Sequence, residues 1–382
     1  MRIAQIAPPW ITVPPKNYGG TEMVIYNLVE ALVAQGHDVT LFAPGDARTS
    51  ARQIAFYPKA LLEEGVPWRA HLKAYYHLYC AIEQVAENHF DIVHMHLSSA
   101  TDMYAFPLTD SLATPHVATL HSNFPFDASP GWTGDADQYF LRKFPWLPVV
   151  AISESARRNQ TWPLNIVGIV YNGIMMSQFP LSKRSRGEHF AWLGRFSPEK
   201  GAHLAIEAAK RAHVRLVLAG TIDRSSKERA QYFYEVIKPQ VDNDQIRYIG
   251  PANMKEKVSL LNRARGFLNP IEWEEPFGMV MAEAMAVACP VISFARGAAP
   301  ELVVDGEMGF LVENLDQMVE RIARIDQIDR AALRPYVERN FSAEAMARSY
   351  LRVYQNIIAA RSASEANGDT PSAKRLSESR PV

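Results

Sequence analysis

The sequence predicts an α/β protein built from two doubly wound, Rossmann-like domains that face each other across a cleft. The chain has 382 residues, which is too long for one ordinary core and fits two domains. Short apolar, β-branched runs recur between longer segments of helical period, which is typical of parallel strands joined by helical crossovers. Hydrophobic residues make up 48% and charged residues 21%, so the composition indicates a globular protein and excludes a disordered or collagen-like chain.

The apolar runs predict the strands of both sheets. Those in the first half are RIAQIA, DVTLFA, DIVHMH, HVATLH and VVAIS, and those in the second half are HFAWLG, RLVLAG, IRYIG, GFLNP, PVISF and GFLV. Between them, helices are expected at 21–35, capped by Thr21 and stopped by Gly36, and at about 67–89.

A polar stretch after Pro180 marks the junction between the domains. We predict a first domain at 1–180 and a second at 181–340, with the linker at 180–188. An amphipathic helix behind Ser342 is expected at 341–361, and residues 362–382 are predicted to be a disordered tail because they have almost no apolar residues.

Charge and cysteine content exclude several functions. The net charge of −1 gives no basic field for nucleic acid, and the two cysteines, Cys80 and Cys289, cannot form a disulfide framework. No apolar stretch approaches the roughly 18 residues of a membrane span. We therefore expect a cytoplasmic protein that has at most peripheral contact with a membrane.

The strongest motif is the run EEPFGMVMAE at 274–283, which follows a predicted strand and opens an apolar helix. Pro and Gly at the start of a helix leave the amides of Phe277, Gly278, Met279 and Val280 available for phosphate oxygens. Glu275 and Glu283 then suit the hydroxylated groups on either side of a diphosphate. The alternative is that Glu275 balances the helix dipole and Glu283 is a solvated surface residue.

A second motif, GRFSPEKG at 194–201, runs from a predicted strand into a helix. Arg195 and Lys200 can neutralise the charge that develops on a diphosphate leaving group without a metal ion. The alternative is a surface turn with two solvated bases.

The first half contributes two weaker signals. Gly19 and Gly20 precede the first long helix, where glycine lets the backbone approach a ligand, although a plain turn explains them as well. His121 closes the strand HVATL, so we expect it at the rim of the cleft, within reach of a sugar hydroxyl.

No metal site is expected. His94, His96 and His116 lie near His121 in the sequence, but no acidic residue stands at ligand spacing beside them, and side chains alternate between the faces of a strand. The Asp-x-Asp pairs at 135–137 and 242–244 are interpreted as an acceptor-covering loop and a turn, respectively.

With GGTE at 19–22, GRFSPEKG at 194–201 and EPFG at 275–278, the chain resembles the retaining glycosyltransferases of family 4, which have the GT-B fold. The shorter elements TLHS, AISES, YNGI and AAPELV agree with this resemblance. It implies that Arg195 and Lys200 contact the diphosphate, Glu275 the donor sugar, Glu283 the ribose and His121 the sugar hydroxymethyl. Asn172, in YNGI, and the amides of Gly19, Gly20, Gly278, Met279 and Val280 would complete the donor site. The resemblance also implies that the C-terminal helix at 341–361 crosses back onto the first domain.

The resemblance predicts a hexosyltransferase that needs no cofactor and retains anomeric configuration. UDP-glucose is the first expected donor and GDP-mannose the second, and the acceptor is a hydroxyl of a sugar, glycan or lipid-linked glycan. Aromatic residues of the first half are candidates to line the acceptor site, with core packing as the alternative: Trp10, Tyr18, Tyr104, Phe124, Phe126 and Trp132. The competing functions are a nucleotide-sugar epimerase of similar architecture and a catalytically idle sugar-nucleotide-binding protein.

Overall fold

The computed structural model describes residues 1–16, 19–68, 70–123, 136–160, 164–182, 187–224 and 227–366. Contacts divide the chain into two compact units. The first comprises Met1–Ile152, Asn159–Val170 and Met346–Val382, and the second comprises Ser153–Arg158 and Tyr171–Ala345. The sequence placed the boundary at 180, whereas the contacts place it between Val170 and Tyr171 and assign the short segment Ser153–Arg158 to the second unit.

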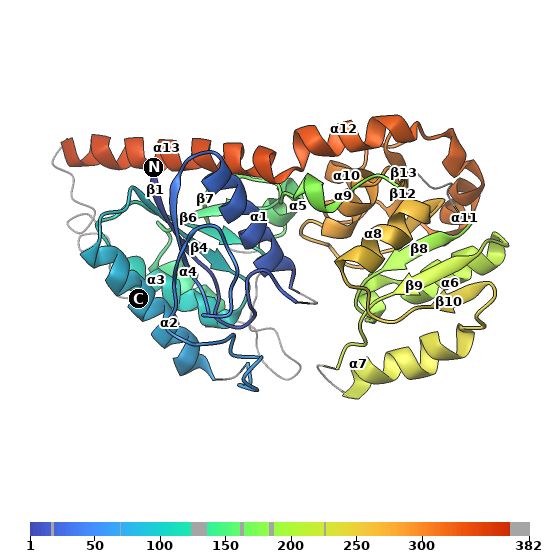
Figure 1. The fold of residues 1–382 in the computed structure, drawn as a ribbon, viewed down its shortest axis with the longest axis horizontal. Coiled ribbons are helices and arrows are strands. Elements are labelled where there is room, and N and C mark those ends of the chain that lie inside the picture. Colours follow the sequence, from blue (N-terminus) through green and yellow to red (C-terminus); the bar gives the residue numbers. More distant parts are fainter. Residues whose placement is uncertain are drawn as a thin grey trace. The chain divides into compact units, whose positions relative to one another are not determined.

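The described part of the first unit holds a parallel sheet with the strand order β3-β2-β1-β4-β5-β6-β7 (Figure 1). Its strands are β1 (Arg2–Ile6), β2 (Asp38–Phe42), β3 (Arg52–Ile54), β4 (Ile92–Leu97), β5 (His116–Leu120), β6 (Pro148–Ala151) and β7 (Asn165–Ile169). Its helices are α1 (Gly20–Ala34), α2 (His71–Glu87), α3 (Ala105–Thr109), α4 (Ala136–Lys143) and most of α13 (Ala343–Ala366).

The second unit repeats this plan, with the strand order β10-β9-β8-β11-β12-β13 in a parallel sheet. Its strands are β8 (Phe190–Leu193), β9 (Leu216–Ala219), β10 (Ile246–Tyr248), β11 (Gly266–Asn269), β12 (Val291–Phe294) and β13 (Gly309–Val312). Its helices are α5 (Glu154–Arg158), α6 (Ala202–Arg211), α7 (Lys227–Tyr232), α8 (Met254–Arg263), α9 (Met279–Ala286), α10 (Ala299–Leu302), α11 (Leu315–Arg324) and α12 (Arg330–Asn340). No described helix combines the length and hydropathy that crossing a membrane would require.

Every strand predicted from an apolar run is present, but the sequence missed β3 and β7. Both lie at the edges of the first sheet, and their residues are exposed or only half-buried. Because an edge strand is not buried on both faces, it has no need of the continuous apolar run by which the inner strands were recognised.

Two helix ends differ from the prediction. Gly19, not Thr21, is the N-cap of α1, and Thr21 lies inside the helix, although Gly36 ends it with a φ of 82° as expected. Ser342 does cap α13, since its Oγ accepts a hydrogen bond of 3.1 Å from the amide of Ala345. That helix continues to Ala366, so the predicted tail is wrong for 362–366; residues 367–382 lie outside the described residues.

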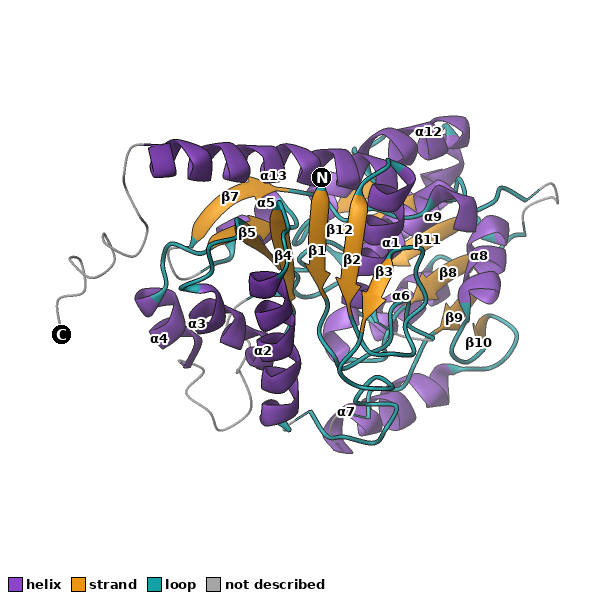
Figure 2. Ribbon diagram, turned by 60° about the vertical axis from the view of Figure 1, so that its left-hand side comes forward, coloured by secondary structure: helices purple, strands orange, loops and turns teal. Residues whose placement is uncertain are grey.

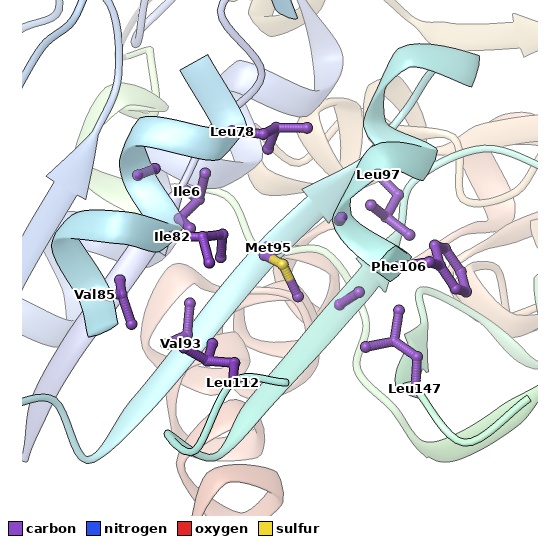
Figure 3. Close-up of a cluster of buried hydrophobic side chains, with 14 of the residues drawn as sticks. Ile6, Leu78, Ile82, Val85, Val93, Met95, Leu97, Phe106, Leu112 and Leu147 are labelled. Atoms are coloured by element: carbon purple, nitrogen blue, oxygen red, sulfur yellow. The ribbon is translucent and has the colours of Figure 1, made fainter. Parts of the chain in front are cut away.

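The strands of the first sheet present different side chains to its two faces. Val93, Met95 and Leu97 on β4 pack with apolar side chains of α2 and α3, including Ile82 and Phe106 (Figure 3). The intervening side chains of β4 point to the opposite face, because successive residues of a strand alternate.

Helix α13 covers that opposite face (Figure 2). The side-chain amide of Gln5, on β1, donates a hydrogen bond of 3.0 Å to the hydroxyl of Tyr354, on α13. The C-terminal helix therefore returns to the first domain, as the GT-B resemblance implied.

Candidate active site

The two motifs of the second half lie side by side in the second unit. Strands β8 and β11 are parallel neighbours, so the loops that follow them leave the same edge of the sheet. The loop after β8 carries residues 194–201 and the loop after β11 carries residues 270–278. The amide of Glu272 donates a hydrogen bond of 2.9 Å to the carbonyl of Glu199, which joins the two loops directly.

Gly201 makes this close approach possible. Its φ is 70°, and a Cβ at this position would lie 1.9 Å from the carbonyl oxygen of Pro270. A side chain here would therefore be strained by the backbone conformation and would collide with the neighbouring loop.

Lys200 and Glu275 form an ion pair between these loops. Trp273 supports both partners: its indole Nε1 donates to Glu275 Oε2 at 3.1 Å, and Lys200 Nζ lies 5.0 Å from its ring centroid. The side chains of Lys200 and Glu275 are 21% and 16% exposed, so both stay accessible to a ligand. The ion pair thus places the predicted cation, Lys200, next to the predicted carboxylate, Glu275, and their charges balance.

Arg195 belongs to a charge cluster on the same loop. Its Nε lies 3.4 Å from Asp223 Oδ2 and its Nη2 4.0 Å from Glu199 Oε1, while Arg229 Nη1 contacts the same Asp223 oxygen at 2.9 Å. The acids hold the guanidinium of Arg195 in place, yet 34% of its side chain is exposed. The sequence analysis missed Asp223 and Arg229; the one available signal was that Asp223 follows strand β9.

Helix α9 begins later than the sequence predicted. Gly278 is its N-cap, with a φ of 87°, and Met279 is its first residue. Phe277 precedes the helix, and its buried ring packs against Tyr171 and Phe341 at centroid distances of 6.1 and 5.9 Å. The ring of Phe277 is thus a core side chain, and the amides of Met279 and Val280 are those of the first helical turn.

Glu283 is buried in the second turn of α9 and is 4% exposed, which excludes the solvated surface residue considered above. Its Oε1 lies 2.5 Å from the Nζ of Lys257, on α8. Its Oε2 is buried and accepts no hydrogen bond from the described residues. Lys257 is a site residue that the sequence analysis missed, because nothing in the composition of α8 connects it with a glutamate on another helix.

Asn172 lies in the same unit and is 4% exposed. Among the residues that the structure describes, none donates a hydrogen bond to its Oδ1. Like Glu283 Oε2, Asn172 Oδ1 is a buried hydrogen-bond acceptor. Burying such an atom lowers the stability of the fold unless a donor bonds to it.

Gly19 and Gly20 differ in how much space surrounds the position that a Cβ would take. A Cβ on Gly19 would lie 2.8 Å from Glu22 Oε2 and 2.8 Å from Pro15 Cβ, whereas a Cβ on Gly20 would meet nothing within 4 Å. Glu22 is buried beneath this turn, and burial, helped by the charge of Asp102, raises its pKa to about 7. Close packing thus requires glycine only at Gly19.

His121 closes β5 as predicted and is 8% exposed. Its Nε2 lies 2.9 Å from the Nδ1 of His96, and burial lowers the pKa of His121 to about 3. The strand argument against a metal was wrong in one respect: His94 and His96 are two residues apart and share a face, with ring centroids 4.2 Å apart. The described residues nevertheless include no group of three or more potential metal ligands.

The remaining candidates are the Asp-x-Asp pairs and the aromatic residues proposed for the acceptor site. Some lie in a turn, some lie in the core, and others are outside the described residues. Asp242 accepts hydrogen bonds from the amides of Asp244 and Ile246 at 2.9 and 2.8 Å, which confirms a turn. Trp10 is buried in a small apolar cluster with Leu61 and Ala74, and Tyr104 packs against the larger, separate core of the first unit. Several candidates lie outside the described residues: Tyr18, Phe124, Phe126, Trp132, Asp135 and the side chain of Asp137.

Both halves of the chain match known glycosyltransferase families. The family profile described as Glycosyltransferase Family 4 matches residues 18–177, and that described as Glycosyl transferases group 1 matches residues 177–339. The chain is 24% identical to a phosphatidyl-myo-inositol mannosyltransferase of Mycobacterium leprae, over 94% of this chain and 97% of that protein. It is 22% identical to spore coat protein SA of Bacillus subtilis, over 93% and 99%.

Two solved structures show the same fold. Sucrose-phosphate synthase of Thermosynechococcus elongatus superposes with a TM-score of 0.74 at 20% identity, covering 94% of this chain and 100% of that one. Anabaena HepE, in complex with UDP and glucose, gives a TM-score of 0.69 at 16% identity, covering 93% and 100%.

The fold and the two family matches define a sugar-nucleotide-dependent transferase. The chain belongs to the GT-B glycosyltransferases of the family 4 type. It is a hexosyltransferase that uses a nucleotide-sugar donor.

Proposed function

We propose that this hexosyltransferase is retaining and metal-independent and that it transfers its hexose to a hydroxyl acceptor. The observation that carries the proposal is that each motif glutamate is paired with a lysine, Glu275 with Lys200 and Glu283 with Lys257. A carboxylate whose charge is balanced can stand close to a diphosphate and still accept hydrogen bonds from neutral hydroxyls.

The roles follow from chemistry and position. Lys200 and Arg195, held in place by their acidic partners, donate hydrogen bonds to the diphosphate as the glycosidic bond breaks, and the amides of Met279 and Val280 bind its oxygens. Glu275 accepts hydrogen bonds from the donor sugar. Glu283 accepts one from the ribose through Oε2, which has no partner among the described residues. Because fixed cations supply the positive charge, the mechanism requires no metal ion or other cofactor.

Retention follows if the acceptor attacks the anomeric carbon from the face that the diphosphate leaves. The bond between that carbon and the diphosphate oxygen breaks with its electron pair going to oxygen, and the acceptor oxygen forms the new bond. The proton of the acceptor hydroxyl passes to the departing diphosphate. Glu275 is already held by Lys200 and Trp273, which favours a role in orientation over one as a nucleophile.

The base and sugar of the donor are the finer part of the proposal. UDP-glucose is the first candidate, and the UDP and glucose bound to Anabaena HepE support it. GDP-mannose is the second, and the mannosyltransferase names of several relatives favour it. Those names also make an inositol lipid one acceptor to test beside free sugars and glycans. Nucleic acid is not proposed as a partner, and the cytoplasmic location stays a prediction.

Ligand-induced stabilisation tests the donor. UDP, GDP, ADP, UDP-glucose and GDP-mannose are compared by thermal shift; a ligand at 100 times its Kd adds about 2.7 kcal/mol of apparent stability. We expect one nucleotide series to raise the melting temperature without added metal and in the presence of EDTA. A requirement for a divalent ion would contradict the metal-independent proposal.

Product analysis tests the reaction. With the stabilising sugar nucleotide and a panel of hydroxyl acceptors, we expect the anomeric proton coupling of the product to show the configuration of the donor. Inverted product would refute retention. A control without acceptor separates the competing functions, since slow hydrolysis indicates a transferase, isomerised sugar nucleotide an epimerase and unchanged donor a binding protein.

A further inference from the structure

A continuous chain of buried polar side chains runs through the face of the first sheet that α13 covers. Its members come from β1, β4, β5 and its carboxyl end, and α13, and each is at most 8% exposed: Gln5, His94, His96, Thr119, His121, Tyr350 and Tyr354. A buried polar group is costly unless it is hydrogen-bonded, so a row of seven such groups needs a connected network.

The part of the network near His121 contains two contacts. His96 Nδ1 lies 2.9 Å from His121 Nε2, and His96 Nε2 lies 2.9 Å from the side-chain oxygen of Gln5. The amide nitrogen of Gln5 faces the other way and donates to the hydroxyl of Tyr354 at 3.0 Å. Gln5 therefore connects the histidine pair to helix α13.

The part beyond Tyr354 continues through His94. Tyr354 Oη lies 2.7 Å from His94 Nδ1, and His94 Nε2 lies 2.6 Å from Thr119 Oγ1. Thr119 Oγ1 lies 2.8 Å from the hydroxyl of Tyr350, where the chain ends.

The hydrogen bonds leave one arrangement of protons at His121. The oxygen of Gln5 can only accept, so His96 carries its proton on Nε2. A neutral imidazole with a proton on Nε2 has an acceptor at Nδ1, and His121 Nε2 must therefore donate to it. In neutral His121 the second nitrogen, Nδ1, is then a lone-pair acceptor.

Burial keeps both rings neutral. It lowers the pKa of His121 to about 3 and that of His96 well below its usual value. Among the residues that the structure describes, His121 has its hydrogen bond at Nε2, to His96, and none at Nδ1.

We propose that Gln5 and Tyr354 set the tautomer of His121, so that it presents Nδ1 as a hydrogen-bond acceptor to a hydroxyl of a bound substrate. The role in substrate binding rests on the proposed function; the tautomer does not. Gln5 and Tyr354 are positioning residues, which make α13 part of the machinery that orients His121 as well as a covering helix.

Nitrogen-15 NMR of the full chain, without ligand, tests the tautomer. Long-range couplings between ring nitrogens and ring protons distinguish a protonated Nε2 from a protonated Nδ1. We expect His121 to be neutral and protonated on Nε2. A proton on Nδ1, or an even mixture of tautomers, would overturn the proposal.

Two matched variants test whether helix α13 sets the tautomer of His121. In Tyr354→Phe nothing fixes the Gln5 amide, so the amide can turn and the His121 tautomers should mix. Tyr350→Phe removes a hydroxyl from the same helix at the far end of the chain and should leave His121 unchanged. Tyr354→Phe loses two buried hydrogen bonds, to Gln5 and His94, and Tyr350→Phe loses one, to Thr119, so Tyr354→Phe should be the less stable variant and the tautomers are compared on folded protein. Equal tautomer spectra in the two variants would refute the role of Tyr354.

Enzyme kinetics separate this inference from the proposed function. Tyr354→Phe should lower kcat/KM about tenfold, the effect of one weakened hydrogen bond, while Tyr350→Phe stays near the wild type. If the wild-type protein shows the expected tautomer but binds no sugar nucleotide, the proposed function fails and the tautomer assignment stands.

Discussion

Lys200 and Glu275 hold each other in place at the edge of the second sheet, so a change at either residue disturbs both. We expect Lys200→Met and Glu275→Gln each to lower kcat/KM for the sugar nucleotide by about 10- to 150-fold, the effect of losing one charge-assisted hydrogen bond. Steady-state kinetics on folded protein check this result.

A matched control for that measurement lies on the neighbouring helix. Arg211, at the end of α6, pairs with Asp316 in an exposed ion pair, with side chains 41% and 76% exposed. Exposed pairs contribute about 0 to 1 kcal/mol, so Arg211→Gln should leave kinetics and folding unchanged. A loss of activity in this control equal to that of Lys200→Met would show that the site assignment is wrong.

The pair formed by Lys257 and Glu283 is more deeply buried, with side chains 17% and 6% exposed. Removing one partner leaves an uncompensated buried charge, so Lys257→Met should lower the free energy of unfolding by about 3 kcal/mol. Urea denaturation of the second unit measures this change.

The double variant Lys257→Met/Glu283→Met separates pairing from simple loss of a side chain. Because it removes both charges, it should recover most of the stability while losing nucleotide affinity. Additive destabilisation by the two substitutions would show that the residues do not interact.

The site could be predicted only in part. Lys200, Glu275 and Glu283 belong to contiguous motifs, whose spacing relates them to strand ends and a helix start. Their partners could not be found in this way. Lys257 and Asp223 come from other elements, and only the folding of the second unit brings them to the motif residues.

Among the elements, the entrance to helix α6 depends on glycine. Gly201→Ala should destabilise the second unit by more than about 2 kcal/mol, because a positive φ and the collision with Pro270 act together. Gly36→Ala is the control, since Gly36 also has a positive φ, of 82°, but open space where the Cβ would lie. Thermal unfolding of both variants measures the difference, and equal shifts would exclude the steric contribution.

Strand identity was easier to predict than element boundaries. The inner strands are recognised by continuous apolar runs, whereas β3 and β7 are edge strands without such runs. The start of α1 was misplaced because Thr21 has a capping side chain, but the close packing of Gly19 against Pro15 and Glu22 decides where the helix begins.

At the scale of the whole molecule, the first unit holds both buried histidines and buried acids. Their shifted pKa values change the stability of this unit with pH in opposite directions. Burial lowers the pKa of His77 to about 4, of His121 to about 3, and of His94 and His96 well below the usual value. The unfolded chain takes up these protons near pH 6.5, so the histidines make folding less favourable as the pH falls below that value.

The buried acids act in the opposite direction. Burial raises the pKa of Glu22 to about 7 and of Asp102 to about 6, so the folded state keeps protons that the unfolded chain releases near pH 4. Their contribution to stability is lost as the pH rises. Because these histidines number four and the acids two, the unfolded chain binds more protons than the folded chain as the pH falls from 7 to 5. The first unit should therefore lose about 1.4 kcal/mol of stability per pH unit for each additional proton that the unfolded chain binds.

Amide hydrogen exchange measures this dependence separately in the two units. After correction for the intrinsic effect of pH, protection of β4 and β5 should decrease from pH 7 to 5 more than protection of β8 and β11. Among the described histidines of the second unit, only His189 has a clearly lowered pKa. Equal changes in both sheets would contradict the assignment of the effect to the buried histidines.

The sequence by itself determined the α/β class, the inner strands, the amphipathic C-terminal helix and the motif residues, because strand burial, helical period and glycine turns depend on neighbouring residues. Only the tertiary structure decided which charges are paired, why Gly201 has no room for a side chain and how Gln5, His96 and His121 connect to Tyr354. These relations join residues that are remote in the chain, and their energies depend on the distance and burial that folding creates.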